Sequence, residues 1–169
     1  NSVAQASLSF ASQNIGARRY ERISKISRTC LLLAALFGLV LGNGVYLLHD
    51  TFLRFYSPDP AVIEAGALRL SVICTTYFLC GLMDTLASIL RAMGKSLLPM
   101  VVTILGACGL RVLWIYTVFP LDRTFFTLFL SYPITWGVTA AVHAVCYFFT
   151  KRTTLRRAQA SAPSEASST

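Results

Sequence analysis

Asp84 is the strongest candidate for a chemical role in this sequence, because it is a carboxylic acid inside a long apolar stretch. The stretch lies between Arg69 and Arg91 and contains no other charged residue. A carboxyl group in low dielectric is either protonated or paired with a cation. Asp84 is therefore a candidate to bind a cation or a proton, or else a structural partner of an arginine or a hydroxyl group. Small and polar residues recur with it at helical spacings, and this stripe should face protein or water: Tyr77, Gly81, Ser88, Arg91 and Lys95.

A second group of polar and aromatic residues surrounds His143, on the same face of the last apolar stretch: Trp136, Thr139 and Tyr147. An aromatic face suits an amphipathic cation, although plain helix packing is the simpler interpretation. With Tyr77, these four residues are our candidates to line a substrate cavity. Arg111 lies nearer the middle of its own stretch, where we expect a structural role in holding carbonyl oxygens or a carboxylate.

Four apolar runs must position these residues. They extend from Thr29 to Leu48, from Arg69 to Arg91, from Lys95 to near Pro120 and from Arg123 to Lys151. Each is long enough for a helix to span the ~30 Å hydrocarbon layer, where unpaired backbone groups are costly. The composition agrees, with only 13% charged residues, against about 25% in soluble domains. We expect an all-α polytopic membrane protein with about four transmembrane helices, plus the end of a preceding one. A soluble bundle would have almost no polar face.

The chain divides into three expected regions. Residues 1–28 should form the end of a membrane helix and a basic cytoplasmic connection, and residues 29–155 a four-helix transmembrane region. Residues 156–169, rich in alanine and serine, should be a disordered cytoplasmic tail. Asp59 and Pro60 have the types expected at the start of a helix. Pro133 should bend the last helix.

The basic residues predict the orientation. They gather before the first run and after the last one, at Arg18, Arg19, Arg22, Lys25, Arg28, Lys151, Arg152, Arg156 and Arg157. Positively charged loops stay in the cytoplasm, so both termini should be cytoplasmic. The net charge of +8 therefore needs no nucleic acid to explain it.

Other function classes find little support. The five cysteines lie in or beside apolar runs without C-x-x-C spacing, which favours buried apolar side chains, and two separated histidines give no metal-ligand pattern. We find no phosphate-binding loop and no hydrolase motif. We expect no enzyme, no metal and no cofactor.

Three short motifs resemble the multidrug and toxic compound extrusion (MATE) family. Gln13-Asn14-Ile15-Gly16-Ala17 precedes Arg19-Tyr20-Glu21-Arg22, and Leu90-Arg91-Ala92-Met93-Gly94 precedes Pro99-Met100. Gly109-Leu110-Arg111 and Tyr132-Pro133-Ile134-Thr135-Trp136 are similar to the last two helices of that family. Their order and spacing cover residues 1 to about 155. Within these motifs, Gln13, Asn14, Arg91 and Arg111 are expected to be structural polar residues.

The resemblance implies part of a twelve-helix, two-lobe transporter. The chain starts at Asn1 without a signal peptide, and we expect a C-terminal fragment that lacks the N-terminal lobe. The family exports cationic, drug-like amphipathic compounds across the plasma membrane in exchange for Na+ or H+. Some branches place a coupling acid one turn before Asp84, where this chain has Cys80. Ala92 replaces a usual glycine, and the usual acidic residue near that turn is absent.

Two alternatives remain open at this point. One is a stand-alone four-helix membrane scaffold protein that is complete as it stands. The other is a lipid-linked sugar flippase of the same superfamily, which would tend to line its cavity with several basic residues. Only Arg111 lies deep in an apolar run here.

Overall fold

The computed structural model describes residues 2–56 and 59–161, and helices form nearly all of that part of the chain. The helices, in chain order, are α1 (Ser2–Gly16), α2 (Arg22–Leu47), α3 (His49–Tyr56), α4 (Pro60–Thr75), α5 (Tyr77–Ala92), α6 (Leu97–Thr103), the π-helix η1 (Ile104–Gly109), α7 (Leu110–Thr117) and α8 (Phe125–Ser161). The described residues include no strand, so the predicted all-α class is confirmed.

Three continuous helical segments are long and apolar enough to cross a membrane: Arg22–Leu47, Leu97–Thr117 and Phe125–Arg156. A fourth crossing is formed by α4 and α5 together, which are bent by 44° at their junction. The prediction of about four transmembrane helices is therefore confirmed, and the break in the fourth was not predicted. Hydroxyl groups explain the position of the break between α4 and α5. Thr76 Oγ1 donates to the carbonyl oxygen of Val72 at 2.6 Å, and such bonds compete with the regular helix ladder.

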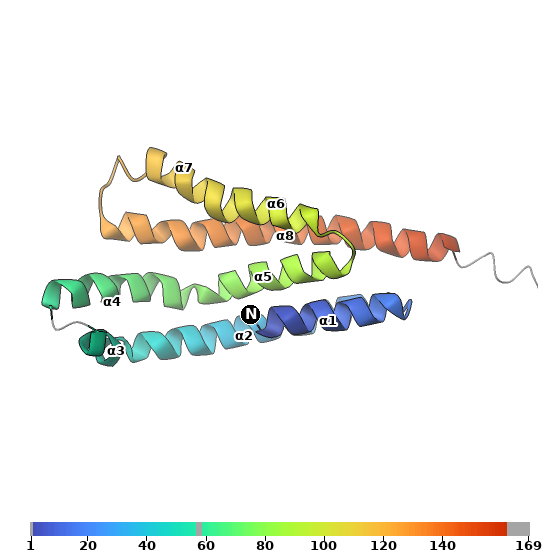
Figure 1. Cartoon of the computed structure of the whole chain (residues 1–169), viewed down its shortest axis with the longest axis horizontal. Coiled ribbons are helices and arrows are strands. Elements are labelled where there is room, and N and C mark those ends of the chain that lie inside the picture. The colour runs from blue at the N-terminus through green and yellow to red at the C-terminus, as the bar shows by residue number, and fades with distance from the viewer. Residues whose placement is uncertain (1, 57–58, 162–169) are drawn as a thin grey trace, which may run out of the picture.

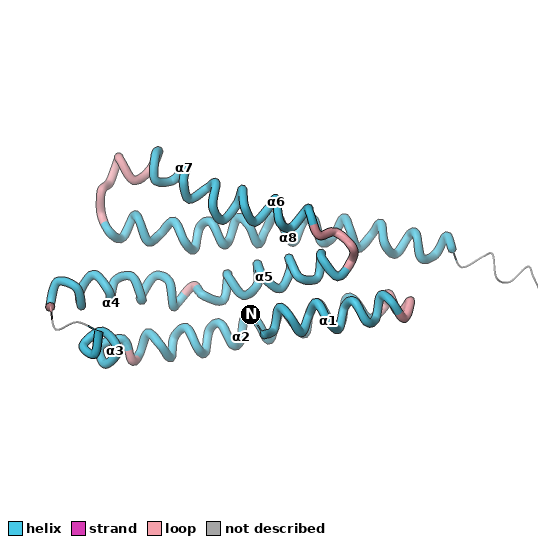
Figure 2. Tube along the Cα trace, in the orientation of Figure 1, coloured by secondary structure: helices cyan, strands magenta, loops and turns pink. Residues whose placement is uncertain are grey.

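The helices run side by side along the long axis of the molecule (Figure 1). The α6–η1–α7 segment lies along α8, the α4–α5 pair runs through the middle, and α2 with α1 completes the opposite side. The α5 helix contacts α1, α2 and α8, so it is the central element. The short connections lie at the two ends of the bundle (Figure 2).

Glycines set the close packing of α2 against the α4–α5 pair. A Cβ atom on Gly38 would lie 2.6 Å from the Cα atom of Phe78, and one on Gly42 would collide with the carbonyl oxygen of Cys74. Small residues allow this approach between membrane helices. Both contacts lie next to the α4–α5 break, so α2 supports the bend directly.

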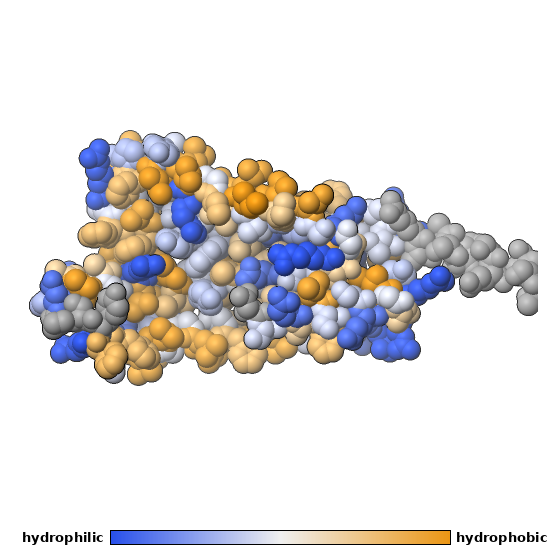
Figure 3. All heavy atoms as spheres, viewed as in Figure 1, coloured by the Kyte–Doolittle hydropathy of each residue, from blue (hydrophilic) through white to orange (hydrophobic). Residues whose placement is uncertain are grey.

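Large apolar side chains face outward over most of the surface, as a lipid-exposed protein requires. In Figure 3 hydrophobic residues dominate the two long edges of the viewed face, whereas hydrophilic ones gather across its middle. The buried core is small and joins α5 to α8 through Leu86, Ile89, Leu90 and Tyr147.

Several predicted boundaries can be compared with the structure. Asp59 caps α4 by accepting a hydrogen bond from the backbone N–H of Ala61 at 3.0 Å, with Pro60 in the first turn, as predicted. The basic stretch Arg22–Arg28 forms the first turns of α2 and is not a separate connection, since arginine and lysine are good helix formers. The α8 helix continues through Pro133 and extends to Ser161. The rest of the predicted disordered tail, residues 162–169, lies outside the described residues.

Candidate functional site

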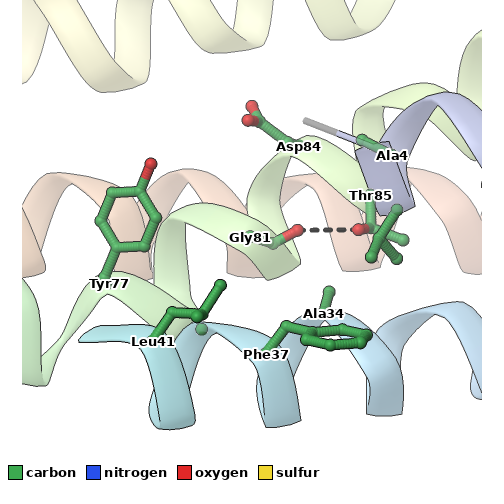
Figure 4. Close-up of a pocket in the computed structure, with 10 residues that line it drawn as sticks. Ala4, Ala34, Phe37, Leu41, Tyr77, Gly81, Asp84 and Thr85 are labelled. Carbon is green, nitrogen blue, oxygen red and sulfur yellow. Dashed lines mark hydrogen bonds between the residues drawn. The ribbon is translucent and has the colours of Figure 1, made fainter. Parts of the chain in front are cut away.

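Asp84 lies beside a pocket of about 130 Å³ near the middle of α5. The pocket is lined by residues of α1, α2 and α5: Val3, Ala4, Ala34, Phe37, Gly38, Leu41, Tyr77, Gly81, Asp84 and Thr85. Most of these side chains are apolar. Figure 4 shows the Asp84 carboxyl group and the Tyr77 hydroxyl group pointing to the same side of α5, away from Leu41 and Phe37. We call this site the Asp84 pocket.

The Asp84 carboxyl group is half-buried and has no partner among the residues that line the pocket. The hydrogen bond drawn in Figure 4 joins Thr85 Oγ1 to the carbonyl oxygen of Gly81 at 2.8 Å. Arg91 lies close enough for its charge to act on the carboxyl group. Within the described residues Asp84 forms no ion pair. The group is thus an available acceptor at membrane depth, where an unpaired acid is costly.

Gly81 lies where α5 packs against α2, one turn before Asp84. A Cβ atom on Gly81 would lie 3.4 Å from the carbonyl oxygen of Ala34, which is van der Waals contact distance. Thr85 is fully buried beside it. The acid therefore lies on a rigid, closely packed helix, a favourable support for a binding group.

A chain of ring contacts connects this region to Arg111. The rings of Tyr77 and Trp136 have centroids 6.1 Å apart at 88°, and those of Trp136 and Tyr132 are 5.8 Å apart at 74°. The Arg111 Cζ atom lies 3.9 Å from the centroid of the Tyr132 ring. Arg111 Nη2 also donates to Thr135 Oγ1 at 3.2 Å. Four residues from α5, α7 and α8 thus form one continuous chain of contacts, which begins at the α4–α5 break.

Arg111 has one hydrogen-bond donor without a partner among the described residues. Its Nε atom is buried and has no hydrogen-bond partner in the described part of the chain. The guanidinium group is held by a ring face and a hydroxyl group, and no carboxylate neutralises it within the described residues. The structural role expected for Arg111 stays a prediction.

The other cavity candidates on α8 are buried between helices. Thr139 donates to the carbonyl oxygen of Thr135 at 2.6 Å, and a Cβ atom on Gly106 of η1 would collide with its hydroxyl group. His143 lies against the carbonyl oxygen of Pro99, and Tyr147 belongs to the buried core. The structure therefore brings Tyr77 and Trp136 together, and separates them from the three buried residues.

The remaining predicted polar residues lie at the end of the bundle that carries the basic connections. Gln13 and Asn14 form local hydrogen bonds in the last turn of α1, to Ser9 Oγ at 3.4 Å and to the carbonyl oxygen of Phe10 at 2.9 Å. Arg91 is exposed in the last turn of α5. Within the described residues no group of three His, Cys, Asp or Glu side chains could hold a metal ion.

Sequence reasoning found only part of a polar line on α8 that has a strict spacing of four residues, and it missed Thr127, Ser131 and Thr135. Its members are all buried: Thr127, Ser131, Thr135, Thr139, His143 and Tyr147. The spacing is visible in the sequence, but apolar residues surround it on every side. Tyr132 was missed as a contact of Arg111 because its partner lies on another helix.

Comparisons with known proteins agree on one family. A model of the MatE family matches residues 1–117. The chain is 27% identical over 86 residues to the probable multidrug resistance protein NorM of Thermotoga maritima, a match that covers 51% of this chain and 18% of that protein. It is 26% identical over 103 residues to the probable multidrug resistance protein YoeA of Bacillus subtilis, covering 61% of this chain and 22% of that one.

Solved structures show the same fold. The bent form of the Vibrio cholerae MATE transporter VcmN superposes with a TM-score of 0.76 at 14% identity, covering 86% of this chain and 33% of that one. A mutant of the same transporter gives a TM-score of 0.78 at 14% identity, covering 89% and 34%. The matches thus span about a fifth of the length of the curated relatives and a third of each solved structure.

Proposed function

Because this chain belongs to the MatE family, we propose that it forms part of the C-terminal lobe of a multidrug efflux transporter that exchanges cationic compounds for Na+ or H+. The printed names of the two curated relatives support the efflux of multiple drugs. The short share of each relative that the chain matches supports a second lobe outside this sequence. The proposal places the protein in the plasma membrane with both ends of this chain on the cytoplasmic side.

One observation carries the coupling role: the Asp84 carboxyl group is half-buried in a membrane helix and forms no ion pair within the described residues. An unpaired acid at this depth costs at least about 2.5 kcal/mol on insertion scales. A bound proton or cation removes that cost. Asp84 is therefore the residue that we assign to ion coupling.

Competition for Asp84 would produce exchange. A cationic drug and a proton or Na+ both neutralise the carboxyl group, so each disfavours the binding of the other. The two liganded states can then have different conformations, which is what a coupled transporter requires. Tyr77 lines the same pocket as this acid and contacts the ring of Trp136, and these two rings suit the apolar body of an amphipathic cation.

The α4–α5 break gives this site a means of moving. Asp84 lies eight residues beyond Thr76, within the inner half of the broken crossing. A change of angle at Thr76 would change the position of Tyr77 relative to Trp136 on α8. Discontinuous helices of this kind commonly form the binding sites of secondary transporters.

The proposal is tested by Asp84→Asn in the full-length protein. Asparagine keeps the volume and the hydrogen bonding but cannot take the charge. Ion-driven efflux of ethidium should fall roughly tenfold or more, the scale of one lost charged contact, while protein abundance changes little. Asp50→Asn is the matched control, because Asp50 is exposed in the first turn of α3 and pairs with His49. A well-expressed Asp84→Asn protein with normal efflux and normal ion dependence would remove Asp84 from the mechanism.

A further inference from the structure

A second, larger pocket lies at the opposite end of the bundle from the basic connections. Its volume is about 630 Å³, and the residues that form it include Tyr46, Ala61, Glu64, Ala65, Leu68 and Phe125. This volume is within the range of small-molecule sites, roughly 300–1,000 Å³. We call it the outer pocket. Figure 1 shows α4 between the outer end of α2 and the start of α8, the three helices that supply these residues.

The sequence of α4 explains why this space is open. Ala61, Ala65 and Leu68 recur at spacings of three and four, so they share one face of the helix with Glu64. Two alanines on that face leave a hollow that larger side chains would fill. Glu64 is exposed in it and forms no ion pair within the described residues.

Two aromatic rings from different helices border the hollow, and each is supported by a second ring. Tyr46 of α2 stacks on His49 with centroids 5.1 Å apart at 9°. Phe125 of α8 stacks on Phe129 with centroids 6.2 Å apart at 15°. Rings that are already held in place lose little freedom when a ligand arrives, which favours binding.

The charges at this end of the bundle also favour a cation. The sequence places three basic residues there (Arg54, Arg69 and Arg123) and four acidic ones (Asp50, Asp59, Glu64 and Asp122). Among the described residues, the opposite end carries one acid, Glu21, and at least ten basic residues. A positively charged molecule is therefore attracted to the outer end and repelled from the inner one.

We propose that the outer pocket is a second binding site for amphipathic organic cations, in which Glu64 contacts the charged nitrogen and the rings of Tyr46 and Phe125 flank the apolar body. Glu64 and Asp84 are separated by about 30 Å of helix, given the 1.5 Å rise per residue. The two sites therefore lie toward opposite faces of the membrane. An exported cation that leaves the Asp84 pocket meets the outer pocket before it reaches solution. The inference rests on the proposed function for the chemical class of the cargo and for the orientation of the chain.

Equilibrium binding of tetraphenylphosphonium to the purified full-length protein tests this site. The measurement uses an Asp84→Asn background, so that the remaining binding reports the outer pocket. Adding Glu64→Gln should weaken that binding about two- to fivefold, the scale of one exposed charge contact. Ala65→Phe, which fills the hollow without changing any charge, should weaken it at least as much. Asp122→Asn removes an acid at the same end that does not line the pocket, and asparagine can still accept the hydrogen bonds from Thr124 and Thr127, so this control should leave the binding unchanged.

The outcomes separate this inference from the proposed function. Unchanged binding after Glu64→Gln, an equal loss after Asp122→Asn, or no binding in the Asp84→Asn background would each overturn the outer pocket as a site. None of these results would affect an efflux activity that depends on Asp84. A wild-type protein that binds no tetraphenylphosphonium would instead contradict both proposals. Glu64 is exposed, so its substitution should not impair folding.

Discussion

His143 and Pro99 are 44 residues apart in the sequence, yet the Nε2 atom of His143 lies 3.3 Å from the carbonyl oxygen of Pro99. This hydrogen bond joins the middle of α8 to the first turn of α6. The imidazole is completely buried, and its Nδ1 atom has no partner within the described residues. A neutral ring with the proton on Nε2 satisfies the geometry, since the carbonyl oxygen can only accept.

His143→Ala should therefore destabilise the protein. The change removes a buried ring and its hydrogen bond, which together cost about 2–4 kcal/mol. The midpoint of thermal unfolding of the full-length protein in detergent should fall by several degrees. Val142→Ala is the matched control, because Val142 is the neighbouring residue and is exposed on the lipid side. Equal midpoints for the two variants would contradict a structural role for the His143–Pro99 contact.

Gly42 and Gly44 provide a sharper test of helix packing, because both lie in α2, two residues apart. Gly42→Ala would place a methyl group against the Cys74 carbonyl oxygen, whereas the space beside Gly44 is open. Overpacking costs about 1–3 kcal/mol, so Gly42→Ala should lower the unfolding midpoint. Gly44→Ala should leave the midpoint unchanged or raise it slightly, since alanine favours a helix. A Gly42→Ala protein as stable as the Gly44→Ala protein would show that α2 does not approach α4 so closely.

Arg111 and Tyr132 should be energetically coupled, because they are in direct contact at the end of the chain of ring contacts that begins at Tyr77. A double-mutant cycle with Arg111→Gln and Tyr132→Leu should give a coupling energy of about 1 kcal/mol in thermal or denaturant unfolding. Tyr116→Leu replaces Tyr132→Leu in the control cycle, because Tyr116 lies on α7 but is 78% exposed. Additive effects in the Tyr132 cycle would contradict the cation–π contact.

The orientation of the chain makes a separate prediction. In intact cells, with the native cysteines replaced, a membrane-impermeant maleimide should label Leu121→Cys and should fail to label Arg156→Cys. Leu121 lies in the outer connection before α8, and Arg156 lies in the last turns of α8 among basic residues. Efficient labelling of Arg156→Cys from outside would reverse the proposed topology.

The sequence predicted the helices well because a long run of apolar residues is enough to identify a membrane helix. Local sequence patterns were sufficient to predict the four crossings, the cap at Asp59 and the family resemblance, because none of these depends on which helices pack together. The break at Thr76 and the π-helix Ile104–Gly109 were not predicted. The break depends on competition between backbone and hydroxyl hydrogen bonds at Thr76. The π-helix lies against α8, where Gly106 contacts Thr139, and a contact between two helices is not visible in the sequence.

The candidate site could be predicted only in part. Asp84 stood out because a lone acid in an apolar run is rare and costly. The interpretation of His143, Thr139 and Tyr147 as cavity residues stays a prediction, and the structure places their side chains between helices. Helical spacing shows which residues share a face, but it does not show which neighbour that face meets. The outer pocket was missed for the same reason, since its walls come from three helices.

Ion flux measured together with drug flux tests the central claim most directly. In proteoliposomes that contain the full-length protein, adding tetraphenylphosphonium on one side should drive Na+ or H+ toward that side. Asp84→Asn should abolish this drug-driven ion movement, while the Asp50→Asn control retains it. Drug-driven ion movement of normal size in the Asp84→Asn protein would contradict the assignment of coupling to Asp84.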